Sequence, residues 1–246
     1  MPPAGLLIDS SGSEQLHIID RDGGNDRQIT SASDLEAWNL LWLPDGNRIA
    51  IWGEFNDDWQ WQAVNVLTGE ISPLSEWKFE GGDVSLSHDS TRLAYTAHSN
   101  PEEQESPVEI FIQDIDGSNS YQLTSIGWDI QNPVWSPDDS QIAFLTCIED
   151  NADQNPNEPF PNAIYTINLD GSSLHKPCVM SLNLDRIAWS PDSESLAVIA
   201  REIQSSGDLF NPEITVYTLN TLNIKTCEKA VLYDAIGPNR IKHVDW

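Results

Sequence analysis

The chain has 246 residues, which is enough for one large domain or two small ones. Its 39 acidic and 12 basic residues give a formal net charge of −27, and a surface this acidic repels nucleic acids and anionic membranes. The charge is compatible with basic proteins, cationic ligands or metal ions as partners, and it also promotes solubility without any partner. Because no linker or charged run divides the chain, we predict a single domain over residues 1–246.

Neither the cysteines nor the hydropathy indicates a disulfide-rich, metal-binding or membrane-spanning protein. Cys147, Cys178 and Cys227 lack the spacing of a disulfide framework or a zinc site, and we expect buried thiols. No stretch approaches the roughly 18 apolar residues of a membrane span. The N-terminal MPPAGLLIDSS lacks the basic segment and the apolar core of a signal peptide. We therefore predict no membrane insertion, no metal and no cofactor.

One motif recurs four times along the chain, with a Trp or Leu three residues before an aspartate. The copies are Trp42 with Asp45, Leu86 with Asp89, Trp135 with Asp138, and Trp189 with Asp192. Their aspartates are 44, 49 and 54 residues apart (89 − 45, 138 − 89, 192 − 138). A polar turn and a second apolar stretch follow each aspartate, as RIAIW, RLAYT, QIAFL and SLAVI. Two apolar strands around a short polar turn predict a β-hairpin.

A second hairpin is predicted in each unit. In EIFIQDIDGSNSYQLT and AIYTINLDGSSLHKP, for example, apolar and polar residues alternate before a turn and another short strand. Asp-Gly pairs at 22–23, 116–117 and 170–171 suit a tight turn, because glycine tolerates a positive φ. The segment DRDGGND at 20–26 also resembles a calcium-binding loop. It lacks the liganding glutamate at the twelfth position, so we favour a turn.

Two hairpins per unit, and no helical periodicity, predict an all-β fold built from four-stranded antiparallel units. Such units at this spacing predict a β-propeller, whose blades pack on each other because one blade cannot bury both of its faces. The stretches WSPDDSQIAF, WSPDSESLAV and IYTINLDGSSLH resemble the Trp-Ser-Pro-Asp-Gly repeats of TolB-like propellers, and the resemblance covers essentially the whole chain. Leu86 and His88 depart from the repeat in one copy. The resemblance implies a protein-binding or scaffolding propeller, usually extracytoplasmic.

The final residue, Trp246, begins a motif that continues at the N-terminus. Placing Met1 after Trp246 aligns Pro2 with Pro44, and Leu7 with Ile49. We therefore expect one blade to combine both ends of the chain, which closes a ring of five blades without a free strand edge. The predicted blades cover approximately 1–32 plus 240–246, 39–75, 83–125, 132–178 and 186–231. The alternative is a piece of a six- or seven-bladed protein.

The predicted loops between strands 2 and 3 of each blade are long and acidic, as in GEFNDDWQ and HSNPEEQESP. Connections between blades are expected on the same face, and they contribute Trp38, Trp77 and Trp128. Aromatic side chains at such a rim supply contact area, and flanking carboxylates steer cationic partners. The alternative is that each ring packs beneath its own loop.

A column of polar residues precedes the motif by three positions in every unit. It comprises Asn39, Asp83, Asn132, Arg186 and His243. The next column is apolar throughout, so the two columns should lie on opposite sides of a strand. We expect the polar column to form a ring at the channel mouth on the acidic face, where it either binds a ligand or lines a water-filled channel.

These residues favour a non-enzymatic scaffold that binds a protein or peptide through its loop face and channel mouth; a basic partner suits the charge. Arg186 and Asp83 would hold opposite charges or peptide ends, and Asn39 and Asn132 would pair with backbone amides. The alternative is a carbohydrate-active or carbohydrate-binding propeller that uses carboxylates in the central funnel. We predict no catalytic residue, a monomer, and, from the family resemblance, an extracytoplasmic location.

Overall fold

The computed structural model describes residues 4–9, 14–19, 27–30, 36–55, 58–79, 82–103, 105–146, 163–179, 183–205, 213–226 and 228–236. All regular secondary structure in these residues is β-strand, so the predicted all-β class is confirmed. In the same residues, no helix has the length and apolarity needed to cross a membrane. Cys147, Cys227, the calcium-like segment at 20–26 and the junction of Trp246 with Met1 lie outside them.

Five antiparallel sheets follow one another along the chain. The first contains β1 (Ala4–Asp9), β2 (Glu14–Ile19) and β3 (Arg27–Gln28). The second contains β4 (Glu36–Trp42), β5 (Arg48–Phe55), β6 (Asp58–Asn65) and β7 (Ile71–Pro73). The third contains β8 (Val84–Leu86), β9 (Arg92–His98), β10 (Val108–Asp114) and β11 (Tyr121–Gln122). The fourth contains β12 (Ile130–Trp135), β13 (Gln141–Thr146), β14 (Ala163–Asn168) and β15 (His175–Val179). The fifth contains β16 (Asn183–Trp189), β17 (Ser195–Ser205), β18 (Glu213–Asn223) and β19 (Lys229–Ile236).

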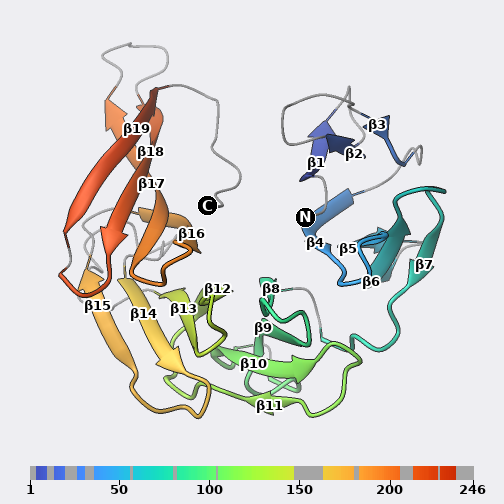
Figure 1. Cartoon of the computed structure of the whole chain (residues 1–246), viewed down its shortest axis with the longest axis horizontal. Helices are drawn as coiled ribbons and strands as arrows, with labels where there is room; N and C mark the ends of the chain where they lie inside the picture. Colours follow the sequence, from blue (N-terminus) through green and yellow to red (C-terminus); the bar gives the residue numbers. More distant parts are fainter. Residues whose placement is uncertain are drawn as a thin grey trace.

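The sheets stand around a central space, as Figure 1 shows, with β4, β8, β12 and β16 nearest the centre and β7, β11, β15 and β19 at the outside. Apolar side chains are buried between successive sheets, in four clusters that each draw on two neighbours. Members from the two sheets of each cluster are, in chain order, Leu16 and Ile51, Trp61 and Leu93, Ile110 and Phe144, and Leu145 and Leu184. Each sheet is therefore stabilised mainly by burial against its neighbours.

Each motif aspartate closes its turn with hydrogen bonds. Asp138 Oδ1 accepts one from Ser136 Oγ at 2.7 Å and one from the Ser140 N–H at 3.1 Å, while Ser136 Oγ accepts the Gln141 N–H at 3.0 Å. The same pattern surrounds Asp89 and Asp192. The residue after the aspartate has a positive φ in all four copies: Gly46 (66°), Ser90 (61°), Asp139 (55°) and Ser193 (57°). The Ser-Pro-Asp motif thus holds a strained turn in place.

Two motif tryptophans connect the fourth and fifth sheets to the sheets that precede them. Trp135 Nε1 donates to the Ser85 carbonyl oxygen at 3.3 Å, and Trp189 Nε1 donates to the Val134 carbonyl oxygen at 3.2 Å. Both acceptors lie one residue before the motif position of the preceding sheet. In the part of the chain that the structure describes, the buried Nε1 of Trp42 has no hydrogen-bond partner. The sheet before Trp42 is the three-stranded first sheet.

Two departures from the repeat compensate for each other in neighbouring sheets. His88 stands where the other copies have proline, so this turn has a backbone N–H that proline lacks. Asp139 stands where the other copies have glycine or serine, and its carboxylate accepts the N–H groups of His88 at 2.7 Å and Asp89 at 2.8 Å. The substitutions therefore create a bond between the turns of the third and fourth sheets.

Acid should weaken the motif turns. Hydroxyl groups of Thr91 and Ser87 donate hydrogen bonds to Asp89 and lower its pKa from 3.8 to about 2. A carboxylate whose pKa is lowered by folding contributes stability above its unfolded pKa, and this contribution is lost as the pH falls through the folded pKa. We therefore expect the unfolding free energies of the wild type and Asp89→Asn to differ at neutral pH and to converge as the pH falls from about 4 to about 2.

Urea denaturation followed by tryptophan fluorescence measures this convergence. Glu70→Gln is the matched control, because the side-chain acceptors of its turn are Asn65 and Thr68, and the Glu70 carboxylate accepts none of the hydrogen bonds found in the described residues of that turn. Parallel pH profiles for Asp89→Asn and the wild type would contradict the prediction.

Candidate functional site

Three residues of the predicted polar column meet on three neighbouring sheets. Asp83 directly precedes β8, Asn132 lies in β12, and Arg186 lies in β16. Asp83 Oδ2 accepts the backbone N–H of Asn132 at 2.6 Å, and Asp83 Oδ1 lies 3.6 Å from Arg186 Nη1. Of the other two members, Asn39 has a described backbone in β4 but no described side chain, and His243 lies outside the described residues.

The unpaired edges of the innermost strands explain why the residues of this column are polar. An innermost strand pairs with its sheet on one side only, so some of its backbone N–H groups need acceptors from elsewhere. The strands also bulge here, because the register shifts between Gln131 and Val134 in β12 and between Leu184 and Arg186 in β16. Asn132 has a φ of 50°, which asparagine tolerates better than most residues. A polar side chain from the preceding sheet supplies the acceptor that the bulged strand lacks.

These hydrogen bonds run in one direction along the chain. Asp83 accepts from the fourth sheet, and Asn132 Oδ1 accepts the backbone N–H of Ile187 in the fifth sheet at 2.6 Å. Arg186 cannot continue the series, because a guanidinium group has donors only. Asn132 is 8% exposed, whereas the side chains of Asp83 and Arg186 are 26% and 34% exposed. Asn132 is therefore a structural link, while Arg186 presents donors at an accessible position.

The aromatic residues predicted for the rim lie in different environments. Trp77 is 5% exposed, and its Nε1 donates to the Ile115 carbonyl oxygen at 3.0 Å, so it packs between the second and third sheets. Trp128 is partly buried, with its ring centroid 6.1 Å from that of Tyr165. The side chain of Trp38 lies outside the described residues. Trp77 therefore packs within the fold, which is the alternative to a contact residue at the rim.

An exposed tryptophan that the sequence analysis did not single out lies at the loop end of the second sheet. Trp59, near the start of β6, is 43% exposed, whereas Trp61 is 2% exposed. The two are separated by one residue in a strand, so they lie on the same face of the sheet. The Trp-Gln-Trp alternation at 59–61 and the position of Trp59 beside a predicted long loop are the sequence features that could have indicated an exposed aromatic side chain.

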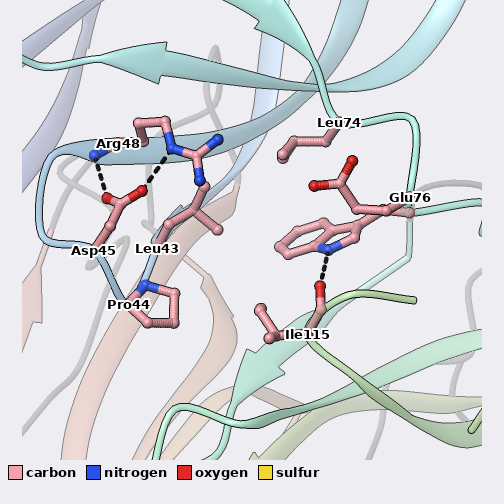
Figure 2. A pocket seen from close by; sticks show the side chains of 8 residues that line it. Leu43, Pro44, Asp45, Arg48, Leu74, Glu76 and Ile115 are labelled. Atoms are coloured by element: carbon pink, nitrogen blue, oxygen red, sulfur yellow. Dashed lines mark hydrogen bonds and ion pairs between the residues drawn. The ribbon is translucent and has the colours of Figure 1, made fainter. Parts of the chain in front are cut away.

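A pocket of about 230 Å³ lies at the opposite end of the second sheet, beside the motif turn (Figure 2). Its apolar lining comes from the second sheet and its connection to the third, with Ile115 from the turn after β10; it comprises Leu43, Pro44, Leu74, Trp77 and Ile115. Arg48 and Asp45, paired at 2.6 Å, lie on one side, and Glu76 lies on the other. The size and lining suit one largely apolar side chain of a bound polypeptide.

Among the described residues, no group of three or more His, Cys, Asp or Glu side chains is arranged to hold a metal ion. Titratable groups of the described column are instead engaged with each other and with backbone N–H groups.

No protein-family model matches the chain, and no curated protein matches it in sequence. Solved structures do resemble it. A TolB from Agrobacterium tumefaciens has a TM-score of 0.67 at 16% identity, over 95% of this chain and 78% of that one. TolB from Acinetobacter baumannii has a TM-score of 0.64 at 18% identity, over 93% and 52% of the two chains. An oligogalacturonate lyase in complex with manganese has a TM-score of 0.58 at 16% identity, over 94% and 62%.

The chain has the fold of a TolB-like β-propeller. This confirms the family resemblance of the Trp-Ser-Pro-Asp motifs at the level of the fold, and the sheets of Figure 1 are its blades. The chain spans about half of the Acinetobacter TolB, at 52%. The TolB-like propeller fold positions Asp83, Asn132 and Arg186 on the inner strands of three consecutive blades.

The link through Asn132 should contribute measurably to the stability of the TolB-like propeller. Asn132→Gly suits the positive φ but removes the acceptor for the Ile187 N–H, so we expect a loss of about 1–2 kcal/mol in unfolding free energy. Asn132→Ala also introduces strain at a positive φ, and we expect roughly 1 kcal/mol of further loss. Urea denaturation measures both. A glycine variant as stable as the wild type would show that the link contributes nothing.

Proposed function

We propose that this TolB-like propeller is a non-enzymatic binding module that holds a peptide or protein segment at the mouth of its channel. The observation that carries the proposal is the partly exposed pair of Arg186 and Asp83, at 3.6 Å on inner strands of different blades. We further propose that the protein acts as a monomer, and that its location is extracytoplasmic, as its family resemblance implies.

Arg186 is the anchor in this proposal. Its guanidinium group can donate two parallel hydrogen bonds to a carboxylate, such as a peptide C-terminus or an acidic side chain. Asp83 is oriented by the Asn132 N–H and holds the guanidinium nearby, so less conformational freedom is lost on binding. The net charge of −27 attracts partners with an excess of basic residues over longer distances. The best ligand is therefore a basic polypeptide that presents a carboxylate at its point of contact.

The likeness to an oligogalacturonate lyase supports a second candidate, a carbohydrate-binding or carbohydrate-active propeller. Hydrolysis of a glycosidic bond requires two carboxyl groups about 5–10 Å apart. Asp83 is the carboxylate that the structure describes in the polar column, and it faces the Asn132 N–H and Arg186. Because these contacts already engage both oxygens of the Asp83 carboxylate, we rank peptide binding first.

Selection from a displayed random-peptide library tests the first candidate. We expect the wild type to enrich peptides that share a carboxylate position, and Arg186→Gln to bind the synthesised peptides at least about tenfold more weakly, because a charge-assisted bidentate contact is lost. Lys225→Gln is the matched control, since Lys225 lies in the turn between β18 and β19 at the far end of the same blade and pairs with Glu194. Selected peptides that bind Arg186→Gln as tightly as the wild type would reject the anchor.

We also infer that the propeller is a five-bladed ring whose first sheet is completed by residues 240–246. Three observations support this proposal. The first sheet has three strands where the others have four. The described residues form four apolar clusters between the five sheets, and a closed ring needs a fifth. Among the described residues, Trp42 Nε1 lacks the acceptor that the preceding inner strand supplies to Trp135 and Trp189.

Hydrogen exchange of the full chain and of a chain ending at residue 239 tests closure. If residues 240–246 pair with β1, their removal exposes an edge of β1, and backbone amides in 4–9 should exchange at least about tenfold faster. Amides of β13 and β14, in the fourth sheet, should be unaffected and serve as the internal control. Equal exchange of residues 4–9 in the two chains would contradict closure by this segment.

A further inference from the structure

The exposed end of the second sheet carries an aromatic side chain beside an acidic one. In the β5–β6 ladder, Glu54 is the direct partner of Trp59, and Trp52 is the direct partner of Trp61. Residues two apart in a strand share a face, so these four side chains form one array on the face that packs toward the third sheet. Trp61 is 2% exposed, while Trp59 is 43% exposed at the end nearer the strand 2–3 loops.

The exposed ring is supported from below by a continuous series of rings. Trp59 lies 6.2 Å from Trp52 between ring centroids, and Trp52 lies 5.6 Å from Trp61. The series continues into the core, at 5.4 Å from Trp61 to Phe79 and 4.0 Å from Phe79 to Tyr95. Aromatic side chains packed in this way have few alternative positions, so Trp59 presents a rigid ring to solvent and loses little freedom when a ligand binds.

The carboxylate beside the Trp59 ring belongs to Glu54, which has no structural partner in the part of the chain that the structure describes. Directly paired residues in an antiparallel ladder have Cβ atoms about 4.5–5.5 Å apart, so the Glu54 side chain lies next to Trp59. None of the described residues forms an ion pair or hydrogen bond with the Glu54 carboxylate. A tryptophan ring attracts a cation to its face, and a neighbouring carboxylate adds to that attraction.

From this array we infer that Trp59 and Glu54 form a binding site for the cationic side chain of a basic peptide segment, arginine above all. Guanidinium stacks on an aromatic ring and donates paired hydrogen bonds to a carboxylate, which a lysine ammonium cannot do as well. The net charge of −27 favours such a ligand over an acidic or neutral one. The site rests on the proposed function in one respect, that a polypeptide binds to the loop face. It lies on a different blade from Arg186.

Isothermal titration of the protein with acetylated, amidated hexa-arginine tests the site, and hexa-citrulline is the neutral isosteric control peptide. We expect Trp59→Ala and Glu54→Gln each to weaken hexa-arginine binding about fivefold or more. Glu70→Gln and Leu67→Ala are the matched controls: each is exposed in the turn at the other end of the same blade, and each should change affinity less than twofold. Trp59→Phe keeps an aromatic ring and should retain most of the binding.

Nuclear magnetic resonance gives a local readout. The Trp59 indole N–H signal, identified by its absence from Trp59→Ala, should shift on addition of hexa-arginine and remain unchanged with hexa-citrulline. Equal losses in Glu54→Gln and Glu70→Gln would show that only net charge matters, and would overturn the site. Binding of a neutral oligosaccharide such as cellohexaose, lost in Trp59→Ala while hexa-arginine binding is kept, would overturn it in favour of a sugar platform.

The two proposals fail separately. Hexa-arginine should bind Arg186→Gln and the wild type with equal affinity, because its amidated end offers no carboxylate to Arg186. Loss of hexa-arginine binding in Arg186→Gln would assign the cation response to the channel mouth and would overturn the Trp59 site. If the peptide library yields no Arg186-dependent ligand, Arg186 is rejected as the anchor at the channel mouth. The hexa-arginine titrations of the Trp59 and Glu54 variants then decide the Trp59 site on their own.

Discussion

The free edges of the innermost strands are the constraint on which the rest of this propeller depends. Each inner strand must place backbone N–H groups along its unpaired side without neighbouring strands to accept them. The protein meets this demand with side chains from the preceding blade, Asp83 for the Asn132 N–H and Asn132 for the Ile187 N–H. The motif tryptophans reinforce the same joints by donating to inner-strand carbonyl groups. The polar side chains of these inner strands therefore serve blade packing, and any ligand site there is built on structural side chains.

The fold could be predicted from the sequence because the residues that define the repeated motif also form the hydrogen bonds of its turn. Ser136 and Asp138, for example, make these bonds within a stretch of six residues. The site was less accessible. The polar column was found by its spacing, but that spacing did not indicate that Asn132 would be buried while Arg186 stayed accessible. Trp77 and Trp59 differ in burial because of packing between blades, which depends on residues distant in sequence, such as Ile115. The position of a tryptophan near a predicted loop therefore does not indicate whether its side chain is buried.

The acidity of the chain has two different uses. At the motif turns, hydroxyl groups lower the pKa values of Asp138 and Asp192, and the carboxylates hold their own backbone. Asp139 extends this use to the neighbouring blade. At the loop end of the second sheet, Glu54 stands beside an exposed ring. Other carboxylates near the loop end also serve the structure, because Glu109 accepts the N–H groups of Ile126 and Gly127, and Asp129 accepts that of Val108. Among the described residues, Glu54 differs from these carboxylates in having no such partner.

The direction of the inter-blade bonds has a consequence for how such a series of blades can grow. Asn132 accepts a bond from the inner strand that follows, and its own backbone N–H has an acceptor, Asp83, on the blade before it. Duplication of the unit around Asn132 would insert a blade with both of its joints intact. Duplication of the unit around Arg186 would not, because a guanidinium group offers the next inner strand no acceptor. A further repeat would therefore be accommodated more easily beside the fourth sheet than after the fifth.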